Sequence, residues 1–282
     1  MLLDRMSAAT LERFLRKLRC EIRANKGLVT TKSPSRFMKN KVPLATLDKK
    51  VDRPGYFQGD TVGHCGTSTE GAYANSLTLT DIDSTWTENR ATFTKKGREI
   101  RTQLADIQKS LPFKMISLNV DNGSEFLNGP VLELVSVTEN GEPAMDYTRS
   151  RPYKKNDNCY VEQKNFTHVR ELFGYERFES PELVVLMNEI YKDYWNPMLN
   201  FFIPSFKIKE KYRVGSKIKK KYDKPKTPYQ RLLESEHISQ EKKQELREAK
   251  RKLNPFTLSA TLEKKLGIFF EELRKYKTGK AS

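Results

Sequence analysis

Three acidic residues lie in local settings that suit the binding of a divalent metal ion. Asp60 closes the run Tyr56-Phe57-Gln58-Gly59-Asp60, and Asp121 ends the run Met115-Ile116-Ser117-Leu118-Asn119-Val120-Asp121. Glu162 falls in the first turn of a predicted helix. Aspartates at two strand ends and a glutamate on a helix can supply the oxygen ligands that magnesium prefers. Two such ions held by shared carboxylates can act on both the attacking and the leaving oxygen of a phosphodiester.

Other residues near these positions have weaker claims to the same chemistry. Asp81 and Asp83 fall in a predicted hairpin turn, where aspartate is favoured by hydrogen bonds to its own backbone, and Glu125 suits the first turn of a helix. His64 follows Asp60 by four residues and would share its face of a continuing strand. It is a candidate phosphate contact, and a hydrogen-bonded structural histidine is the alternative interpretation.

The segments that carry these residues alternate between strand and helix patterns. Strands are predicted over residues 55–64, 74–81 and 85–92, then up to Asp121, and finally over 144–148. Helices are predicted over residues 96–111 and 124–137 and from about Asp157 onward. The first three strands can pair antiparallel, whereas strands joined through a helix run parallel. The order therefore predicts an α/β protein with a mixed five-stranded sheet flanked by helices.

The helix that begins near Asp157 carries the predicted third ligand. Glu162, Phe166, Val169 and Phe173 follow the spacing i, i+4, i+7 and i+11, which predicts that the glutamate shares the helix face packed on the sheet. A carboxylate buried there without a partner would be costly. A metal site at the sheet edge resolves this conflict, and a salt bridge to a neighbouring lysine or arginine is the alternative.

Composition divides the chain into three regions. Residues 1–52 are predicted to form a basic helix over Ser7–Arg23 followed by a linker, and residues 53–204 hold the strand and helix pattern of a core. Residues 205–282 are predicted to be a basic tail that ends in helices over about 239–252 and 259–277.

The charge of the chain favours a polyanionic partner. Lysine and arginine number 52 against 36 aspartates and glutamates, giving a net charge of +16. Eleven basic residues between Lys207 and Arg231 face only Glu210 and Asp223. We expect DNA contacts from the loop before the Glu162 helix, from that helix and from the tail, and solvated surface charge is the alternative for any single residue. The candidate contacts are Arg149, Arg151, Tyr153, Lys154, Lys155, Lys164, Lys217, Lys219, Lys220 and Lys221.

Cysteine usage and hydropathy indicate an intracellular protein. Cys20, Cys65 and Cys159 are far apart and lack the C-x-x-C spacing of a zinc finger, and an odd number argues against a disulfide framework. No apolar run approaches the length of a membrane span, and the first residues are too poor in apolar side chains for a signal peptide. We therefore expect a cytoplasmic location.

Several motifs in fixed order carry a family resemblance. They are Gly59-Asp60-Thr61-Val62-Gly63-His64-Cys65-Gly66, then Asp121-Asn122-Gly123-Ser124-Glu125-Phe126, then residues 149–158 continuing to Glu162-Gln163-Lys164-Asn165, and finally Arg213-Val214-Gly215-Ser216-Lys217 with Thr227-Pro228-Tyr229-Gln230-Arg231-Leu232-Leu233. Together they make the chain similar to bacterial insertion-sequence transposases with an integrase-type catalytic core, which belong to the DDE group that includes retroviral integrases. The resemblance covers about residues 53–233.

This resemblance implies a fold, an activity and a set of partners. The implied fold is RNase H-like, with helical and basic extensions at both ends. The implied catalytic and metal-binding residues are Asp60, Asp121 and Glu162, with two Mg²⁺ ions that Mn²⁺ can replace. The implied reaction is DNA strand cleavage and strand transfer, as in transposition and DNA integration, by a homodimer or higher oligomer on transposon ends and target DNA in the bacterial nucleoid.

The N-terminal region departs from the family pattern and leaves rival interpretations open. Relatives carry complete helix-turn-helix modules before the core, whereas here only the helix over Ser7–Arg23 is predicted, which makes a truncated copy an expectation. One rival is a catalytically inactive DNA-binding transposase fragment. The other is an RNase H-like nuclease that cuts without joining.

Overall fold

We describe the fold from a computed structural model of the chain. The structure describes Thr10 and residues 33–45, 51–136, 145–152 and 155–281. The predicted helix over Ser7–Arg23 lies outside these residues, apart from Thr10. Among the described residues, no helix has the length and apolar character needed to cross a membrane.

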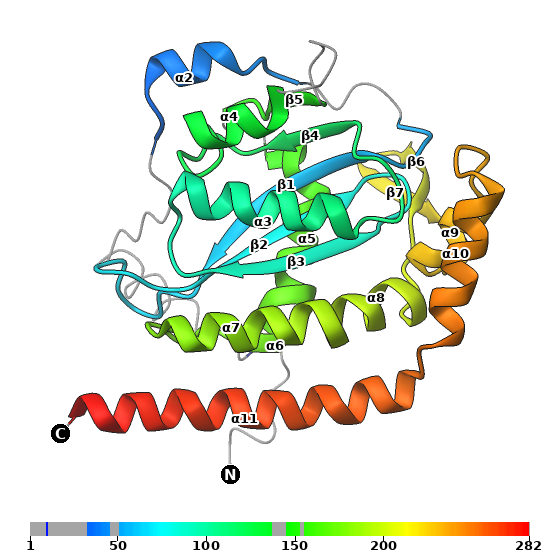
Figure 1. Cartoon of the computed structure of the whole chain (residues 1–282). Helices are drawn as coiled ribbons and strands as arrows, with labels where there is room; N and C mark the ends of the chain where they lie inside the picture. The colour runs from blue at the N-terminus through cyan, green and yellow to red at the C-terminus, as the bar shows by residue number, and fades with distance from the viewer. Residues whose placement is uncertain (1–9, 11–32, 46–50, 137–144, 153–154, 282) are drawn as a thin grey trace.

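A mixed five-stranded sheet forms the centre of the molecule (Figure 1). Its strands are β1 (Tyr56–Gly63), β2 (Asn75–Asp81), β3 (Thr87–Thr92), β4 (Ser117–Val120) and β5 (Asp146–Arg149), and they lie in the order β3-β2-β1-β4-β5. The first three pair antiparallel, and β1, β4 and β5 run parallel. The predicted fold class, an RNase H-like mixed sheet flanked by helices, is therefore confirmed.

One face of the sheet is apolar and carries two helices. Side chains alternate between the two faces of a strand, so Phe57, Leu79 and Leu118 share this face. They pack with α3 (Gly97–Ser110) and α4 (Gly129–Ser136) in one buried core. The helices contribute Ile100, Leu104, Ile107, Val131 and Val135.

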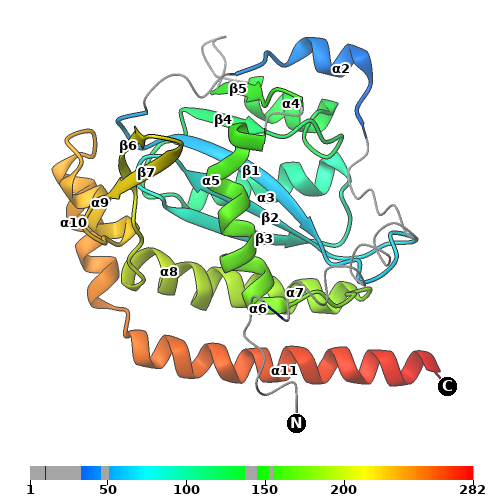
Figure 2. The ribbon, with the colours of Figure 1, turned by 180° about the vertical axis from the view of Figure 1, so that it is seen from behind.

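The other face of the sheet is polar, although it is also covered. Gln58, Thr80 and Thr87 are neighbours across three strands, and all are buried. A long helix crosses this face (Figure 2), built from α5 (Cys159–Lys164), a π-helical turn η3 (Asn165–Arg170) and α6 (Glu171–Phe173). The side chain of Gln58 fixes its start, since Oε1 accepts hydrogen bonds from the backbone N–H groups of Tyr160 (3.1 Å) and Val161 (3.4 Å).

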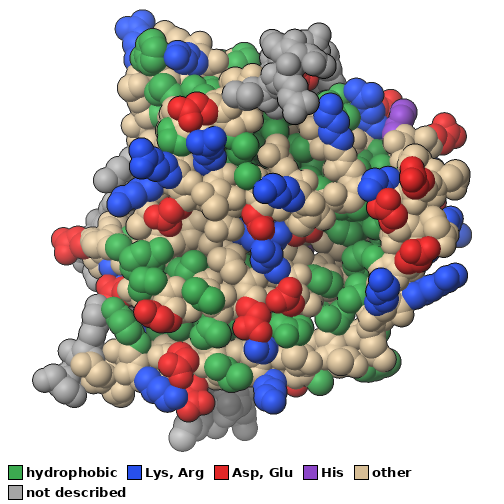
Figure 3. All heavy atoms as spheres, in the orientation of Figure 1, with side chains coloured by type: hydrophobic (Ala, Val, Ile, Leu, Met, Phe, Trp, Pro, Cys, Tyr) green, Lys and Arg blue, Asp and Glu red, His purple; other side chains and the backbone are tan. Residues whose placement is uncertain are grey.

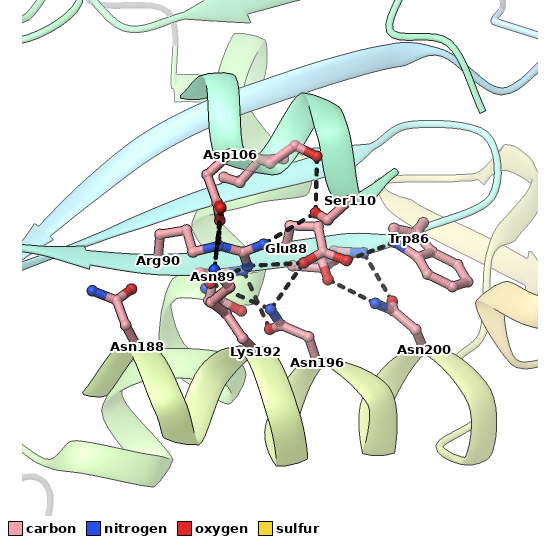
Figure 4. A network of polar contacts seen from close by, with 12 residues as sticks. Trp86, Glu88, Asn89, Arg90, Asp106, Ser110, Asn188, Lys192, Asn196 and Asn200 are labelled. Atoms are coloured by element: carbon pink, nitrogen blue, oxygen red, sulfur yellow. Dashed lines mark hydrogen bonds and ion pairs between the residues drawn. The ribbon is translucent and has the colours of Figure 1, made fainter. Parts of the chain in front are cut away.

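The β3 edge of the sheet is closed by asparagine side chains. A long helical segment follows this edge, built from α7 (Pro181–Glu189), a π-helical turn η4 (Ile190–Trp195) and α8 (Asn196–Phe202). Three of its asparagines each pair with one backbone unit of β3 through both the carbonyl oxygen and the amide nitrogen, and Figure 4 shows the contacts of Asn196 and Asn200. The pairs are Asn188 with Ala91, Asn196 with Asn89 and Asn200 with Thr87. We call this set the asparagine ladder.

The β5 edge is met by a segment from the N-terminal region. The short helix α2 (Arg36–Lys41), capped by Ser35, is followed by Val42, which is buried in the main core. The Ala45 N–H donates to the Arg149 carbonyl (3.0 Å), and the Arg149 N–H donates to the Pro43 carbonyl (2.9 Å). Part of the stretch predicted to be a linker is therefore docked on the sheet.

The C-terminal region combines a hairpin with three helices. The strands β6 (Ile208–Val214) and β7 (Lys217–Tyr222) pair antiparallel, and their formation was not predicted from the sequence. They are followed by α9 (Pro228–Glu234), α10 (Gln240–Arg251) and α11 (Pro255–Ala281). Tyr229 and Leu232 of α9 pack with Trp86 and Phe201 of the core region, and Phe269 of α11 packs on Phe173 and Phe178. The tail is therefore built onto the core.

Candidate active site

Asp60 and Asp121 lie at the same place on two adjacent strands. The register pairs Gly59 of β1 with Val120 of β4, and each aspartate is the next residue of its chain. Asp60 faces the polar side of the sheet, because its neighbour Gly59 faces the apolar side, and Asp121 is the first residue after β4. The charge of Asp121 acts directly on the pKa of Asp60. The sequence prediction that these two residues meet is in agreement with this arrangement.

Two neighbours hold the carboxylate of Asp60. Its Oδ1 accepts a hydrogen bond from the Thr61 backbone N–H (2.7 Å), and its Oδ2 accepts one from Nδ2 of Asn165 (2.6 Å). Burial and the nearby negative charge of Asp121 together raise the pKa of Asp60 to about 7. The two hydrogen bonds lower this pKa, but they do not offset burial and repulsion.

Asp121 is held by the turn that follows it. Its Oδ1 accepts a hydrogen bond from the Gly123 backbone N–H (2.9 Å). A Cβ atom at Gly123 would lie 2.9 Å from this oxygen and 2.4 Å from Oε2 of Glu125, so only glycine leaves room for both carboxylates. Burial and the charge of Glu125 raise the pKa of Asp121 to about 6.

Glu125 is a third carboxylate in this region, and its role was underrated from the sequence. It is buried with an exposed fraction of 2%. Its Oε1 accepts hydrogen bonds from Oγ1 of Thr61 (2.9 Å) and from Nζ of Lys95 (3.0 Å). Lys95 also lowers the pKa values of Asp60 and Asp121, although the other causes prevail and both pKa values are raised. Glu125 and Lys95 therefore belong to the same electrostatic cluster as the two aspartates.

Glu162 is not on the helix face that packs against the sheet, and this prediction was wrong. Glu162 and Phe166 are exposed, whereas Val161, Val169 and Phe173 are buried. The inward-facing residues recur at intervals of four from Val161. The π-helical turn that starts at Asn165 has more residues per turn than an α-helix, so residues four apart stay on the same face. Glu162 lies one residue further on, which rotates it about 100° toward solvent.

The three predicted metal ligands do not form one group. Among the residues that the structure describes, no cluster of three or more histidine, cysteine, aspartate or glutamate side chains is placed to hold a metal ion. The structure brings Asp60 and Asp121 together and leaves Glu162 outside. The side chain that reaches Asp60 from the helix is instead Asn165, whose Oδ1 is buried and accepts no hydrogen bond from the described residues.

His64 is a core residue and not a phosphate contact. Its side chain is fully buried, with its ring stacked on Phe178 at a centroid distance of 4.7 Å. Nε2 is hydrogen-bonded to Oγ of Ser76 (2.8 Å), and burial lowers the pKa of His64 to about 3. A neutral buried imidazole cannot reach a bound phosphate, so the structural alternative holds.

Two arginines of the predicted basic loop have structural partners. Arg149 donates from Nε to the carbonyl of Val42 (2.9 Å) and from a terminal nitrogen to Oδ1 of Asn122 (2.9 Å). Arg151 forms a two-point ion pair with Asp157, with both contacts at 2.9 Å. The guanidinium groups are thus used to fix the loop and the N-terminal segment. Tyr153 and Lys154 lie outside the described residues, as does the side chain of Lys155.

The remaining predicted DNA contacts differ in exposure. Lys164 is half-buried, and burial and the nearby charge of Arg231 lower its pKa to about 8. Lys217, Lys219, Lys220 and Lys221 are all exposed on β7. These four tail lysines therefore have the accessibility that a phosphate contact requires.

Comparisons with known proteins locate relatives without settling an activity. No protein-family model matches the chain. The chain is 35% identical to a Sinorhizobium fredii protein described as "Uncharacterized protein y4rM" over 227 residues, which are 80% of this chain and 63% of that protein. The chain thus spans less than two thirds of the length of this relative.

Two retroviral structures are among the solved structures that match part of the chain. The bovine immunodeficiency virus (BIV) integrase catalytic core domain is 17% identical, with a TM-score of 0.39, and the match covers 65% of this chain and 96% of that one. A chain of the simian T-cell lymphotropic virus intasome, in complex with the PP2A regulatory subunit B56 gamma, is 17% identical with a TM-score of 0.37, over 46% of this chain and 44% of that one. The integrase-type fold assignment itself depends on the strand order described above.

Proposed function

We propose that the chain is a DDE transposase that cleaves and joins DNA strands in a reaction that depends on a divalent metal. The observation that carries this proposal is the pair of carboxylates Asp60, within β1, and Asp121, directly after the parallel strand β4, with their pKa values raised to about 7 and about 6. Perturbed carboxyl groups at a sheet end are typical of functional sites. The motifs around both residues support the same reaction through their resemblance to insertion-sequence transposases.

The two aspartates fit a divalent cation. Their repulsion and burial would be relieved by a positive charge, and Gly123 keeps the space between Asp121 and Glu125 open. Asp60 and Asp121 would hold the ion, with Mg²⁺ as the natural choice and Mn²⁺ as a substitute. Bound there, the metal would polarise the scissile phosphodiester and make water or a DNA 3′-hydroxyl a better nucleophile.

The surrounding residues would orient this pair. Thr61 donates one hydrogen bond from its backbone to Asp60 and another from its side chain to Glu125, so one residue links both carboxylates. Asn165 approaches Asp60 from the helix. Because these contacts fix the carboxylate planes before a ligand arrives, less ordering would be needed when the ion and DNA bind.

The third carboxylate can be either of two glutamates. Glu162 is the one that the family resemblance assigns, and a change in the start of the helix would have to bring it inward. Glu125 already lies beside Asp121. Glu162→Gln and Glu125→Gln make the same chemical change at the two positions. Binding of Mn²⁺, followed by electron paramagnetic resonance, should weaken more strongly in the variant that removes the true ligand.

Asp60→Asn tests the proposed function. Magnesium-dependent joining of a labelled transposon-end oligonucleotide to target DNA should fall at least a hundredfold, a loss on the order of 3 kcal/mol of transition-state stabilisation. Asp146→Asn is the matched control, since Asp146 is an exposed aspartate on β5 of the same sheet. Undiminished joining by the Asp60→Asn variant would refute the assignment of Asp60.

A second candidate is a DNA-binding protein without catalysis. The exposure of Glu162 and the lack of a three-carboxylate group among the described residues favour it. The same oligonucleotide assay separates the candidates. Joined products support a transposase, cut but unjoined products support an RNase H-like nuclease, and DNA that is bound but unchanged supports the binding protein. DNA as partner and assembly as a dimer or higher oligomer remain part of the first proposal.

A further inference from the structure

The β6–β7 hairpin is a basic arm that the core does not cover. Every residue of both strands is exposed. The two strands carry seven lysines and arginines against the single acidic residue Glu210. Like charges at this density repel one another and do not favour the folded hairpin, which argues for an anionic partner.

The register of the hairpin divides its side chains between two faces. Lys211 pairs with Lys220, and Arg213 pairs with Ile218, so these four residues share one face. Tyr212 pairs with Lys219, and Val214 pairs with Lys217, on the opposite face. Glu210 and Lys221 also belong to this second face. We call the two surfaces the Lys211 face and the Lys219 face.

The Lys211 face is directed toward the start of α5. The ammonium group of Lys211 is close enough to the Cys159 thiol to lower its pKa, although burial outweighs this effect. Cys159 is the first residue of α5, and Glu162 lies three residues later. Figure 2 shows the hairpin beside the first part of this helix, on the side of the sheet that carries the candidate site. The Lys219 face points the other way.

The basic character of the hairpin is not shared by the surface on the other side of the molecule. Figure 3 shows that surface, over α3, α7 and α11, with basic and acidic side chains intermingled. A polyanion would therefore find the denser positive charge at the hairpin.

We infer that the Lys211 face, through Lys211, Arg213 and Lys220, binds the phosphate backbone of the DNA strand that leads into the site at Asp60 and Asp121. The inference depends on the proposed function for its choice of DNA as the occupant. The Lys219 face, with Lys217, Lys219 and Lys221, contributes little to this binding. The four tail lysines predicted from the sequence therefore have different roles. Lys220 acts with Lys211 and Arg213 of β6, and the other three lysines lie on the opposite face.

Two triple variants test this division. The Lys211→Ala, Arg213→Ala, Lys220→Ala variant and the Lys217→Ala, Lys219→Ala, Lys221→Ala variant remove the same charge from opposite faces of one hairpin. Binding to a fluorescein-labelled duplex is measured by anisotropy over a series of salt concentrations. The slope of log K against log salt should fall by about 0.9 for each phosphate that the first variant no longer neutralises, and should change little in the second. Equal reductions in slope, or a larger reduction in the second variant, would overturn the inference.

Two further measurements keep the result independent of folding and of catalysis. In the unaltered protein, duplex DNA should protect Lys211 and Lys220 from acetylation, while Lys219 and Lys221 stay reactive; protection of the second pair alone would contradict the inference. The Asp60→Asn variant should keep the full salt slope while its joining activity disappears. If the protein does not join DNA but the two triple variants still differ in salt slope, the proposed reaction is wrong and the role of the hairpin in DNA binding is supported.

Discussion

The β3 edge and the site formed by Asp60 of β1 and Asp121 after β4 both hold buried polar groups, but these groups have different surroundings. At the edge, each backbone unit that faces outward is paired with an asparagine, and the guanidinium of Arg90 lies among Glu88, Asp106 and Ser110 (Figure 4). In the candidate site, the negative charges of Asp60 and Asp121 repel each other. Hydrogen-bonded buried groups such as those at β3 typically have a structural role. Buried carboxylates that repel each other are typical of a functional site that binds a ligand.

This difference also concerns what each region contributes to stability. The asparagine ladder occupies the outward-facing backbone groups of β3, which makes the edge strand unavailable for pairing with another chain. Carboxyl groups whose pKa values are raised destabilise the folded chain at neutral pH, because folding has to hold them charged. The polar groups at the β3 edge therefore stabilise the folded chain. The carboxyl groups of Asp60 and Asp121 destabilise it at the place where catalysis is proposed.

Removal of Arg90 should have the largest effect on stability. The side chain of Arg90 is 2% exposed and pairs with Glu88 (3.0 Å) and Asp106 (2.7 Å). The Arg90→Met variant leaves Glu88 buried without its cation, and the free energy of unfolding should fall by roughly 3–5 kcal/mol. Denaturant titration followed by circular dichroism measures this decrease.

The neighbouring ion pair of Lys192 supplies the control for that variant. Lys192 contacts Asp106 at 3.1 Å, and both side chains are partly exposed, at 42% and 38%. Lys192→Ala should therefore change the free energy of unfolding by less than about 1 kcal/mol. If the two variants were equally destabilised, burial would not be what distinguishes the β3 edge.

Removal of one asparagine of the ladder should have an intermediate effect. Asn196→Ala leaves the buried N–H and C=O of Asn89 without their side-chain partner, at 3.2 and 3.3 Å in the native chain. We expect a decrease of about 2–3 kcal/mol in the free energy of unfolding. Amide hydrogen exchange at Asn89 should accelerate more than exchange at Thr78 of β2, which lies between the neighbouring strands β1 and β3. Unchanged protection at Asn89 would show that the ladder is dispensable.

A pH-dependent effect of the opposite sign is expected at Asp60. The pKa of Asp60 is raised from 3.8 to about 7, so the folded state binds the proton more tightly than the unfolded state. This contribution to stability is complete below the unfolded pKa of about 4 and is lost as the pH rises to about 7. Asp60→Asn should therefore become more stable relative to the native chain by on the order of 1 kcal/mol per pH unit across this range.

Unfolding experiments at pH 4 and pH 8 measure this difference, with Asp146→Asn as the control. Mg²⁺ should also raise the melting temperature of the native chain and leave that of the Asp60→Asn variant nearly unchanged. If the stability difference between the native chain and the Asp60→Asn variant stayed constant with pH, the proposed contrast between the β3 edge and the site at Asp60 would be contradicted.

The sequence was sufficient to predict the fold because its local signals agree. Alternating strand patterns before Asp81 and helix periodicity at Ile100, Leu104 and Ile107 both match the observed elements. The turn after Asp81 forms as predicted, with its carboxylate accepting hydrogen bonds from Ser84. The hairpin of β6 and β7 was missed because both of its faces are exposed, so no apolar alternation reveals the strands.

The site was only half predictable, for a reason that lies in the helix. Asp60 lies within β1 and Asp121 directly follows β4, and the strand patterns of the sequence locate both positions within a residue or two. The side chain that faces Asp60 from the helix depends on the rotation of that helix, and a π-helical turn changes it. Asn165 was visible in the sequence, but an ideal helical period directs attention to Glu162.

The asparagine ladder has a consequence for assembly. A second copy cannot continue the sheet at β3 unless it displaces Asn188, Asn196 and Asn200 from their backbone partners. At the opposite border, Pro43 and Ala45 already engage the end of β5. Subunits that gather on one DNA molecule would therefore have to meet through helices, the hairpin or the nucleic acid, and each would keep its own sheet intact.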